Sequence, residues 1–116
     1  MNQEVKNGIE IDPLVSESIE EFVHRIRKRF GAAIKRVILF GSYAKGTAGP
    51  DSDVDIMVIT SQIPYAYEYE IMSMGYDLYL EMGILLSVKI RNEEDFEKNQ
   101  NFMFIQSVIH EGLAVG

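Results

Sequence analysis

The sequence predicts an α/β (α+β) fold, in which helices pack on a small mixed β-sheet. The first observation is the order of patterns along the 116 residues: helix, strand, short helix, strand, helix, strand, helix. The second is that the strand segments are short, rich in β-branched residues and almost wholly apolar. The third is an ordinary globular composition, with 47% hydrophobic and 25% charged residues. We expect one core and one domain over residues 1–116.

The first helix is predicted over residues 12–31. Asp12 suits the N-cap, Pro13 suits the first helical position, and Gly31 suits the C-terminal stop. One face of this helix is expected to be buried, because apolar residues recur on it at three- and four-residue spacing: Ile19, Phe22, Val23, Ile26 and Phe30.

Two apolar strands are expected next, over residues 36–40 and 54–60. The connection between them, residues 41–52, contains three of the nine glycines and one of the three prolines, which predicts a short helical turn and then a loop. The remaining elements are expected to be a helix over 64–80, a strand over 84–90, and helices over 93–98 and 102–110, with Gly112 as a stop.

Gly41 and Ser42 lie where a buried strand turns into the start of a helix. Unpaired backbone N–H groups and the helix dipole at such a point favour an anion such as a triphosphate. Glycine allows the phosphate to approach the backbone closely, and the serine hydroxyl adds a hydrogen-bond donor. A Gly-Ser pair taken alone is more often an ordinary turn.

Asp53 and Asp55 open the second apolar strand, two residues apart. Their side chains therefore point to the same face, with Cα atoms about 6.5 Å apart. Two carboxylates beside an apolar strand repel each other unless they share divalent cations, and Mg2+ takes one or two carboxylates together with phosphates and water. An Asp-x-Asp alone is more often a solvated or capping pair. Its combination with the Gly-Ser turn and a glycine-containing loop predicts a site for Mg2+ and a nucleoside triphosphate.

These residues resemble a known family. Gly41-Ser42, Gly46 and Asp53-Val54-Asp55 resemble the pattern of the DNA polymerase β-like nucleotidyltransferase superfamily, and the short chain resembles its minimal nucleotidyltransferase branch, of the antitoxin type. The resemblance covers about residues 14–112 and implies a polymerase-β-like nucleotidyltransferase core. It is distinct from the Walker A loop, because no Gly-Lys-Ser/Thr ends the glycine turn.

The resemblance implies a two-metal transfer of a nucleoside monophosphate, AMP from ATP in the first instance, to an acceptor, with pyrophosphate leaving. Asp53 and Asp55 would be catalytic and would bind the metal ions. Four residues would bind the nucleotide: Gly41, Ser42, Lys45 and Ser52. For Lys45 the simpler interpretation is an ordinary exposed lysine on a short helix.

Active members of this superfamily commonly carry a third carboxylate on a neighbouring strand, and this sequence does not show one. In the strand at 84–90, alternation puts Ser87 and Lys89 on one face and apolar residues on the other. Ser87 or Lys89 is therefore expected where the third acid would lie. Glu81 and Asp77 are alternatives from the preceding helix, although acids on helix surfaces are commonly solvated.

Composition limits the partners. The formal net charge of −7 disfavours binding to nucleic acid, and is compatible with metal ions, a basic protein partner or simple solubility. There is no cysteine, which excludes disulfides and thiolate metal sites. The N-terminus has no basic stretch followed by an apolar run, and no run of eighteen apolar residues occurs. We expect a cytoplasmic protein without membrane contact.

Other residues carry weaker signals. His24 and His110 lack the paired spacing of a metal site. Aromatic and apolar residues around the helix at 64–80 and near the C-terminus are expected in the core or at a partner or dimer interface: Tyr65, Tyr67, Tyr69, Tyr76, Tyr79, Phe102, Phe104 and Ile105.

Two functions remain open at the level of sequence. One is a Mg2+-dependent enzyme, and the resemblance implies that its acceptor is a tyrosine of a helical HEPN-domain toxin. The other is a catalytically weak or inactive protein of the same fold, which neutralises its partner by contact alone. The missing third acid favours the second, and a homodimer or a heteromeric complex fits both.

Overall fold

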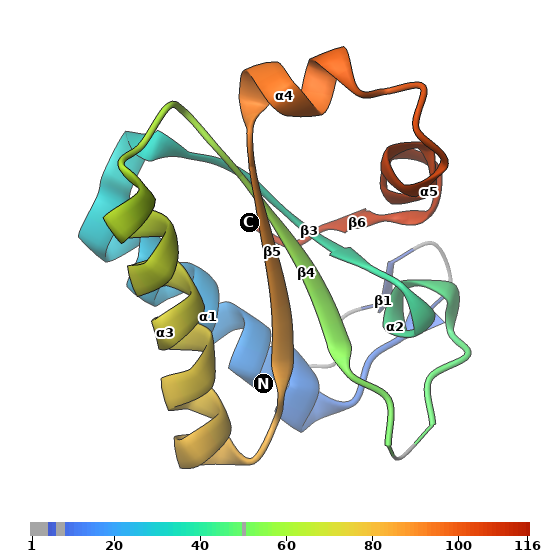
Figure 1. Cartoon of the computed structure of the whole chain (residues 1–116). Helices are drawn as coiled ribbons and strands as arrows, with labels where there is room; N and C mark the ends of the chain where they lie inside the picture. Colours follow the sequence, from blue (N-terminus) through green and yellow to red (C-terminus); the bar gives the residue numbers. More distant parts are fainter. Residues whose placement is uncertain (1–4, 7–8, 50) are drawn as a thin grey trace.

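A mixed four-stranded sheet forms the centre of the structure (Figure 1), a computed structural model that describes residues 5–6, 9–49 and 51–116. Its strands in chain order are β3 (Ile34–Phe40), β4 (Val54–Thr60), β5 (Leu86–Asn92) and β6 (Leu113–Ala114). They lie side by side in the order β5-β4-β3-β6. β4 is antiparallel to β3 and parallel to β5, and β6 is antiparallel to β3. The predicted small mixed sheet is confirmed.

Helices cover both faces of this sheet (Figure 1). In chain order they are α1 (Pro13–Phe30), the 3₁₀ turn η1 (Gly31–Ala33), α2 (Ser42–Lys45), α3 (Tyr65–Met82), α4 (Glu93–Lys98) and α5 (Met103–Glu111). α1 and α3 pack on one face, and α4 and α5 pack on the other. A separate short hairpin precedes them, formed by β1 (Val5–Lys6) and β2 (Ile9–Glu10).

Alternate residues of the two central strands build two cores. Val37 of β3 and Val58 of β4 face α1 and α3, whereas Ile38 and Met57 face α4 and α5. All four are buried, and burial of each such side chain stabilises the fold by about 1.5–3 kcal/mol. Both central strands are therefore covered on both faces. A consequence is that a polar residue on these strands is tolerated only near a strand end.

α1 begins and ends where its sequence predicts. The Asp12 carboxylate accepts hydrogen bonds from the backbone N–H groups of Leu14 at 2.9 Å and Val15 at 3.4 Å. Pro13 follows at the first helical position, and Gly31 ends the helix with a φ of 57°. An N-cap of this kind stabilises a helix by about 1 kcal/mol.

Three differences from the predicted elements have tertiary causes. β5 was expected over 84–90 and lies two residues later, because it pairs with β4 as far as Thr60 opposite Asn92. Asn92 then caps α4, since its side chain accepts a 2.8 Å hydrogen bond from the N–H of Asp95. β3 begins at Ile34 instead of residue 36, beyond a register irregularity. β1, β2 and β6 have two residues each and are defined by pairing, which local sequence does not encode.

The aromatic residues divide between core and surface. Tyr67 packs against Phe30, with ring centroids 5.3 Å apart, whereas most of the other tyrosines of α3 are exposed. Near the C-terminus, Ile105 is buried, Phe104 meets Phe40 edge-on at 5.5 Å, and Phe102 is exposed. His24 and His110 are both exposed. In the part of the chain that the structure describes, no helix combines the length and apolarity needed to cross a membrane.

Candidate functional site

Gly41 turns the end of β3 into the short helix α2. Its φ of 74° and ψ of −154° lie in a region that is essentially restricted to glycine. A Cβ atom at this position would collide with the carboxylate of Asp55 on β4. α2 ends at once at Gly46, which adopts the left-handed conformation with a φ of 77°. Glycine at position 41 therefore permits both the turn and the close approach of a carboxylate.

Asp55 lies at the edge where β3 ends and β4 begins. It is paired with Phe40 on one side and with Ser87 on the other. The pKa of Asp55 is raised, chiefly because the side chain is partly buried and to a smaller extent because of repulsion by Asp53. Lys89 on β5 opposes this shift and lowers the pKa. The structure thus brings the half-buried carboxylate of Asp55 to the glycine turn, and the exposed carboxylate of Asp53 is close enough to act on its pKa.

Ser42 is the first residue of α2 and is half-exposed beside Gly41. The backbone of this turn is well connected, because Lys45 N donates to Gly41 O at 3.1 Å and Thr47 N donates to Ser42 O at 3.0 Å. The predicted phosphate-binding pair therefore stands on a hydrogen-bonded turn, in which Gly41 lies against Asp55.

Lys45 forms an ion pair with an acid of α5. Its Nζ lies 3.7 Å from Glu111 Oε2 at the end of α5. Glu111 also accepts a 2.6 Å hydrogen bond from the hydroxyl of Ser107, and this bond more than Lys45 holds the pKa of Glu111 below its ordinary value. Both partners are exposed, so this ion pair is weak and the lysine can be released.

Ser52 closes the loop that leads into β4. Its Oγ accepts a 2.9 Å hydrogen bond from Gly49 N, and its own N–H donates to Gly49 O at 3.1 Å. These two hydrogen bonds give Ser52 a structural role, because they fix the loop immediately before Asp53. Its predicted contact with nucleotide stays a prediction.

Ser87 occupies the strand position beside Asp55 in the parallel β4–β5 pairing, and Lys89 follows it on the same face. Glu81 does not serve as a substitute acid, because both of its oxygens accept hydrogen bonds from Arg25 of α1, at 2.8 and 2.9 Å. Asp77 is exposed on α3, which packs on the face of the sheet opposite to Asp55, so it does not serve as a substitute acid either. Among the residues that the structure describes, no three His, Cys, Asp or Glu side chains gather as a metal site would require.

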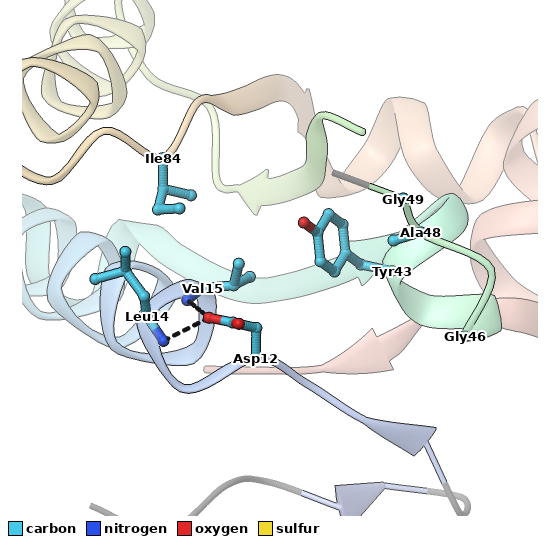
Figure 2. A pocket seen from close by; sticks show the side chains of 8 residues that line it. All are labelled: Asp12, Leu14, Val15, Tyr43, Gly46, Ala48, Gly49 and Ile84. Carbon is cyan, nitrogen blue, oxygen red and sulfur yellow. Dashed lines mark hydrogen bonds between the residues drawn. The ribbon is translucent and has the colours of Figure 1, made fainter. Parts of the chain in front are cut away.

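A pocket of about 470 Å³ adjoins the glycine turn on the side of α1 (Figure 2). The Tyr43 ring extends into the space between the start of α1 and the Gly46–Gly49 segment, with Ile84 and Val15 nearby. Sequence reasoning missed this pocket, since its walls come from three separate segments of the chain, residues 12–15, 43–49 and 84. Its walls are both apolar and polar, and they include neither Gly41 and Ser42 nor the two aspartates.

Comparison with known proteins agrees with this arrangement. The family model described as "Nucleotidyltransferase domain" matches residues 19–113. A Methanocaldococcus jannaschii protein, provisionally assigned as a protein adenylyltransferase, is 32% identical over 99 residues, which cover 85% of this chain and 95% of that protein. The protein adenylyltransferase MntA of Thermococcus cleftensis is 44% identical over 55 residues, covering 44% of this chain and 54% of its own.

A solved structure supports the fold. The crystal structure of a toxin-antitoxin with AMP-PNP superimposes with a TM-score of 0.54 at 19% identity, over 84% of this chain and 72% of that one. The family match spans β3, the glycine turn, both aspartates and β5, which are the parts that build the site. The chain therefore belongs to the nucleotidyltransferase domain family.

Proposed function

We propose that this protein transfers AMP from ATP to a hydroxyl group on a protein partner. The observation that carries the proposal is the Asp55 carboxylate lying against Gly41, at the point where a buried strand turns into α2. The naming of similar proteins as protein adenylyltransferases supports the choice of a protein as the acceptor.

Asp53 and Asp55 fit a site for Mg2+. They offer hard oxygen ligands two residues apart, one half-buried and one exposed, next to a turn on which phosphates could supply further oxygens. Two protein carboxylates are enough, because Mg2+ keeps several waters and is usually completed by substrate phosphates. When bound, the metal would neutralise charge on the triphosphate during an in-line displacement.

The chain's own residues would bind and orient the nucleotide. The backbone of Gly41 allows close approach of the β- and γ-phosphates, and the Ser42 hydroxyl and N–H add donors. Lys45 lies one helical turn from Ser42 and, once released from Glu111, could add a positive charge there.

In the reaction, the acceptor hydroxyl oxygen forms a bond to the α-phosphorus, and the bond from that phosphorus to the pyrophosphate breaks. The hydroxyl proton must pass to a base, and with no third carboxylate in place it passes to water. Ser87 stands beside Asp55 where a third carboxylate would take part, and a neutral hydroxyl is a poor proton acceptor. Loss of such a group costs on the order of 10²–10⁴ in rate, so we expect slow turnover.

The acceptor we propose is a tyrosine of a HEPN-domain toxin, which makes this chain an antitoxin. The likeness in fold to a toxin-antitoxin crystallised with AMP-PNP supports that assignment. The net charge of −7 also favours a basic protein partner over nucleic acid.

The test is direct. The protein is incubated with ATP, Mg2+ and a purified HEPN-domain protein, and intact-mass spectrometry follows the partner. We expect a mass increase of one AMP or a small multiple of it, located on tyrosine, and no increase with the Asp53→Asn/Asp55→Asn variant. Absence of any modification after prolonged incubation, with a partner that binds, would contradict the transferase activity.

A second candidate function is supported by one observation: β5 places Ser87 and Lys89, not a carboxylate, on the face that carries Asp55. Lys89 carries a positive charge close enough to lower the pKa of Asp55, so it competes with a metal ion for that carboxylate. In this alternative the chain binds its partner and neutralises it without chemistry. Neutralisation of the HEPN-domain protein by the Asp53→Asn/Asp55→Asn variant at wild-type level would favour it.

A further inference from the structure

Large side chains form a continuous stripe along the outer side of α3. The exposed fractions are 82% for Tyr65, 70% for Tyr69, 52% for Met72, 57% for Tyr76 and 42% for Tyr79. We call these five residues the α3 stripe. Side chains so exposed contribute little to the core, and a contiguous exposed apolar surface of this kind marks an interaction site.

The core does not need the α3 stripe, because the other side of the same helix is already packed. Ile71, Gly75 and Leu78 are buried against the sheet and α1. Tyr67, which does not belong to the stripe, packs on Phe30 instead. α3 therefore presents two apolar sides, one facing the sheet and one facing outward, in the layer that it forms with α1 (Figure 1).

The spacing within the α3 stripe indicates what would cover it. Its residues follow one another at intervals of four, three, four and three, which is the repeat of a helix–helix seam. At 1.5 Å per residue, the 18 residues of α3 offer a seam about 27 Å long. A helix packed along it would place its own apolar residues between these tyrosines.

The charges of α3 indicate what kind of helix can bind the α3 stripe. α3 contains four acidic residues and no lysine or arginine. Glu70 is bound by Arg29 and Glu81 by Arg25, both from α1, which leaves Glu68 and Asp77 to meet a partner. A second copy of α3 would bring acid against acid, in a chain whose net charge is already −7.

We propose that the α3 stripe binds an amphipathic helix of a partner protein, whose apolar seam is flanked by lysine or arginine. Aromatic residues are the usual anchors of such interfaces, and the flanking charges would set the orientation of the bound helix. This surface is independent of the proposed transfer reaction, because α3 and Asp55 lie on opposite faces of the sheet. A partner could therefore dock while the glycine turn stays open.

Two synthetic helical peptides test this with the full chain. They share one leucine seam at alternating four- and three-residue spacing and carry either lysine or glutamate on its flanks. Fluorescence anisotropy should show at least tenfold tighter binding of the lysine peptide, weakening as salt rises. Tyr69→Ser/Tyr76→Ser should lose at least tenfold in affinity. Phe102→Ser/Met103→Ser, which removes exposed apolar residues of 64% and 86% exposure elsewhere, should not change the affinity.

A charge-reversed variant separates recognition from loss of folding. Glu68→Lys/Asp77→Lys keeps the α3 stripe, and should bind the glutamate peptide better than the lysine peptide, with an unchanged melting temperature. Equal affinity for both peptides, or full binding by Tyr69→Ser/Tyr76→Ser, would overturn the proposal. So would a homodimer in sedimentation that Tyr69→Ser/Tyr76→Ser dissolves, because the stripe would then be covered by a second copy.

Discussion

The carboxylate of Asp55 lies in the space that a Cβ atom at Gly41 would need. These residues are 14 positions apart in the chain and meet because Phe40, just before the turn, is paired with Asp55 across the β3–β4 ladder. The contact brings together the backbone proposed to bind phosphate and the carboxylate proposed to bind metal, which is the geometric basis of the proposed site.

Gly41→Ala should damage both stability and binding. The backbone conformation is essentially restricted to glycine, so the added methyl group should lower the free energy of unfolding by about 1–3 kcal/mol and push Asp55 aside. Urea denaturation measures the first effect and calorimetry with ATP the second. Gly49→Ala is the matched control, because a Cβ there meets nothing within 4 Å. Equal stability of Gly41→Ala and wild type would refute the contact.

Asp53→Asn/Asp55→Asn should abolish Mg2+-dependent binding of ATP. Both side chains keep their size but lose the charge that a divalent cation requires. Calorimetric titration with ATP, with and without Mg2+, should give at least a tenfold loss of affinity for the double variant. If wild type binds neither ATP nor any other nucleoside triphosphate in the presence of Mg2+, the nucleotide site itself is wrong.

Ser87→Asp should raise the rate of AMP transfer. The new carboxylate would stand beside Asp55, at the place where an active family member would be expected to carry its third acid. We expect an increase approaching about 10²-fold if the missing group limits the rate. Ser87→Asn is the control of similar size without the charge, and should stay at the wild-type rate. A Ser87→Asp rate equal to that of Ser87→Asn would show that this position does not limit the chemistry.

Asp55→Asn should raise the melting temperature at neutral pH. The folded-state pKa of Asp55 lies above its ordinary value of 3.8, chiefly because of burial, so its charged form costs stability once the pH exceeds both values. This cost shrinks as the pH falls through the folded-state pKa and disappears below 3.8, where the carboxyl group is protonated in both the folded and the unfolded state. Thermal unfolding from about pH 7 down to about pH 3 should therefore show a gain that shrinks to nothing. A gain that grows on acidification would contradict the raised pKa.

Lys45→Ala should weaken ATP binding by roughly threefold to tenfold, which is up to about 1.4 kcal/mol. The reason is that the lysine can leave its exposed partner Glu111 for a triphosphate bound at the start of α2. Glu111→Gln releases the lysine, so it should bind ATP at least as tightly as wild type. Calorimetry at low and high salt checks both. An unchanged affinity in Lys45→Ala would make the lysine an ordinary surface residue.

Local patterns in the sequence were enough to predict α1, β4 and the site motif. Asp12 and Pro13 predict the start of α1 and Gly31 predicts its end, because the hydrogen bonds and backbone angles of a helix cap involve only neighbouring residues. β4 was predicted at its observed bounds, residues 54–60, since its apolar residues are bracketed by Asp53 and the turn after Thr60. Gly41, Ser42, Asp53 and Asp55 were recognised for the same reason: the chemistry of each depends on residues next to it.

Only the tertiary structure decided which side chains lie around that motif. The parallel register of β4 and β5 sets Ser87 beside Asp55, and the core packed on both faces of the sheet determines that register. Likewise, Glu81 is bound by Arg25 and so does not act as a third acid, and Lys45 forms an ion pair with Glu111 of α5. Such contacts join residues far apart in the chain, and their free energy depends on the whole fold, so no local pattern records them. The sequence by itself determined α1, β4 and the residues of the proposed site motif, whereas packing decided the bounds of β3 and β5, the short paired strands and the side chains that surround the motif.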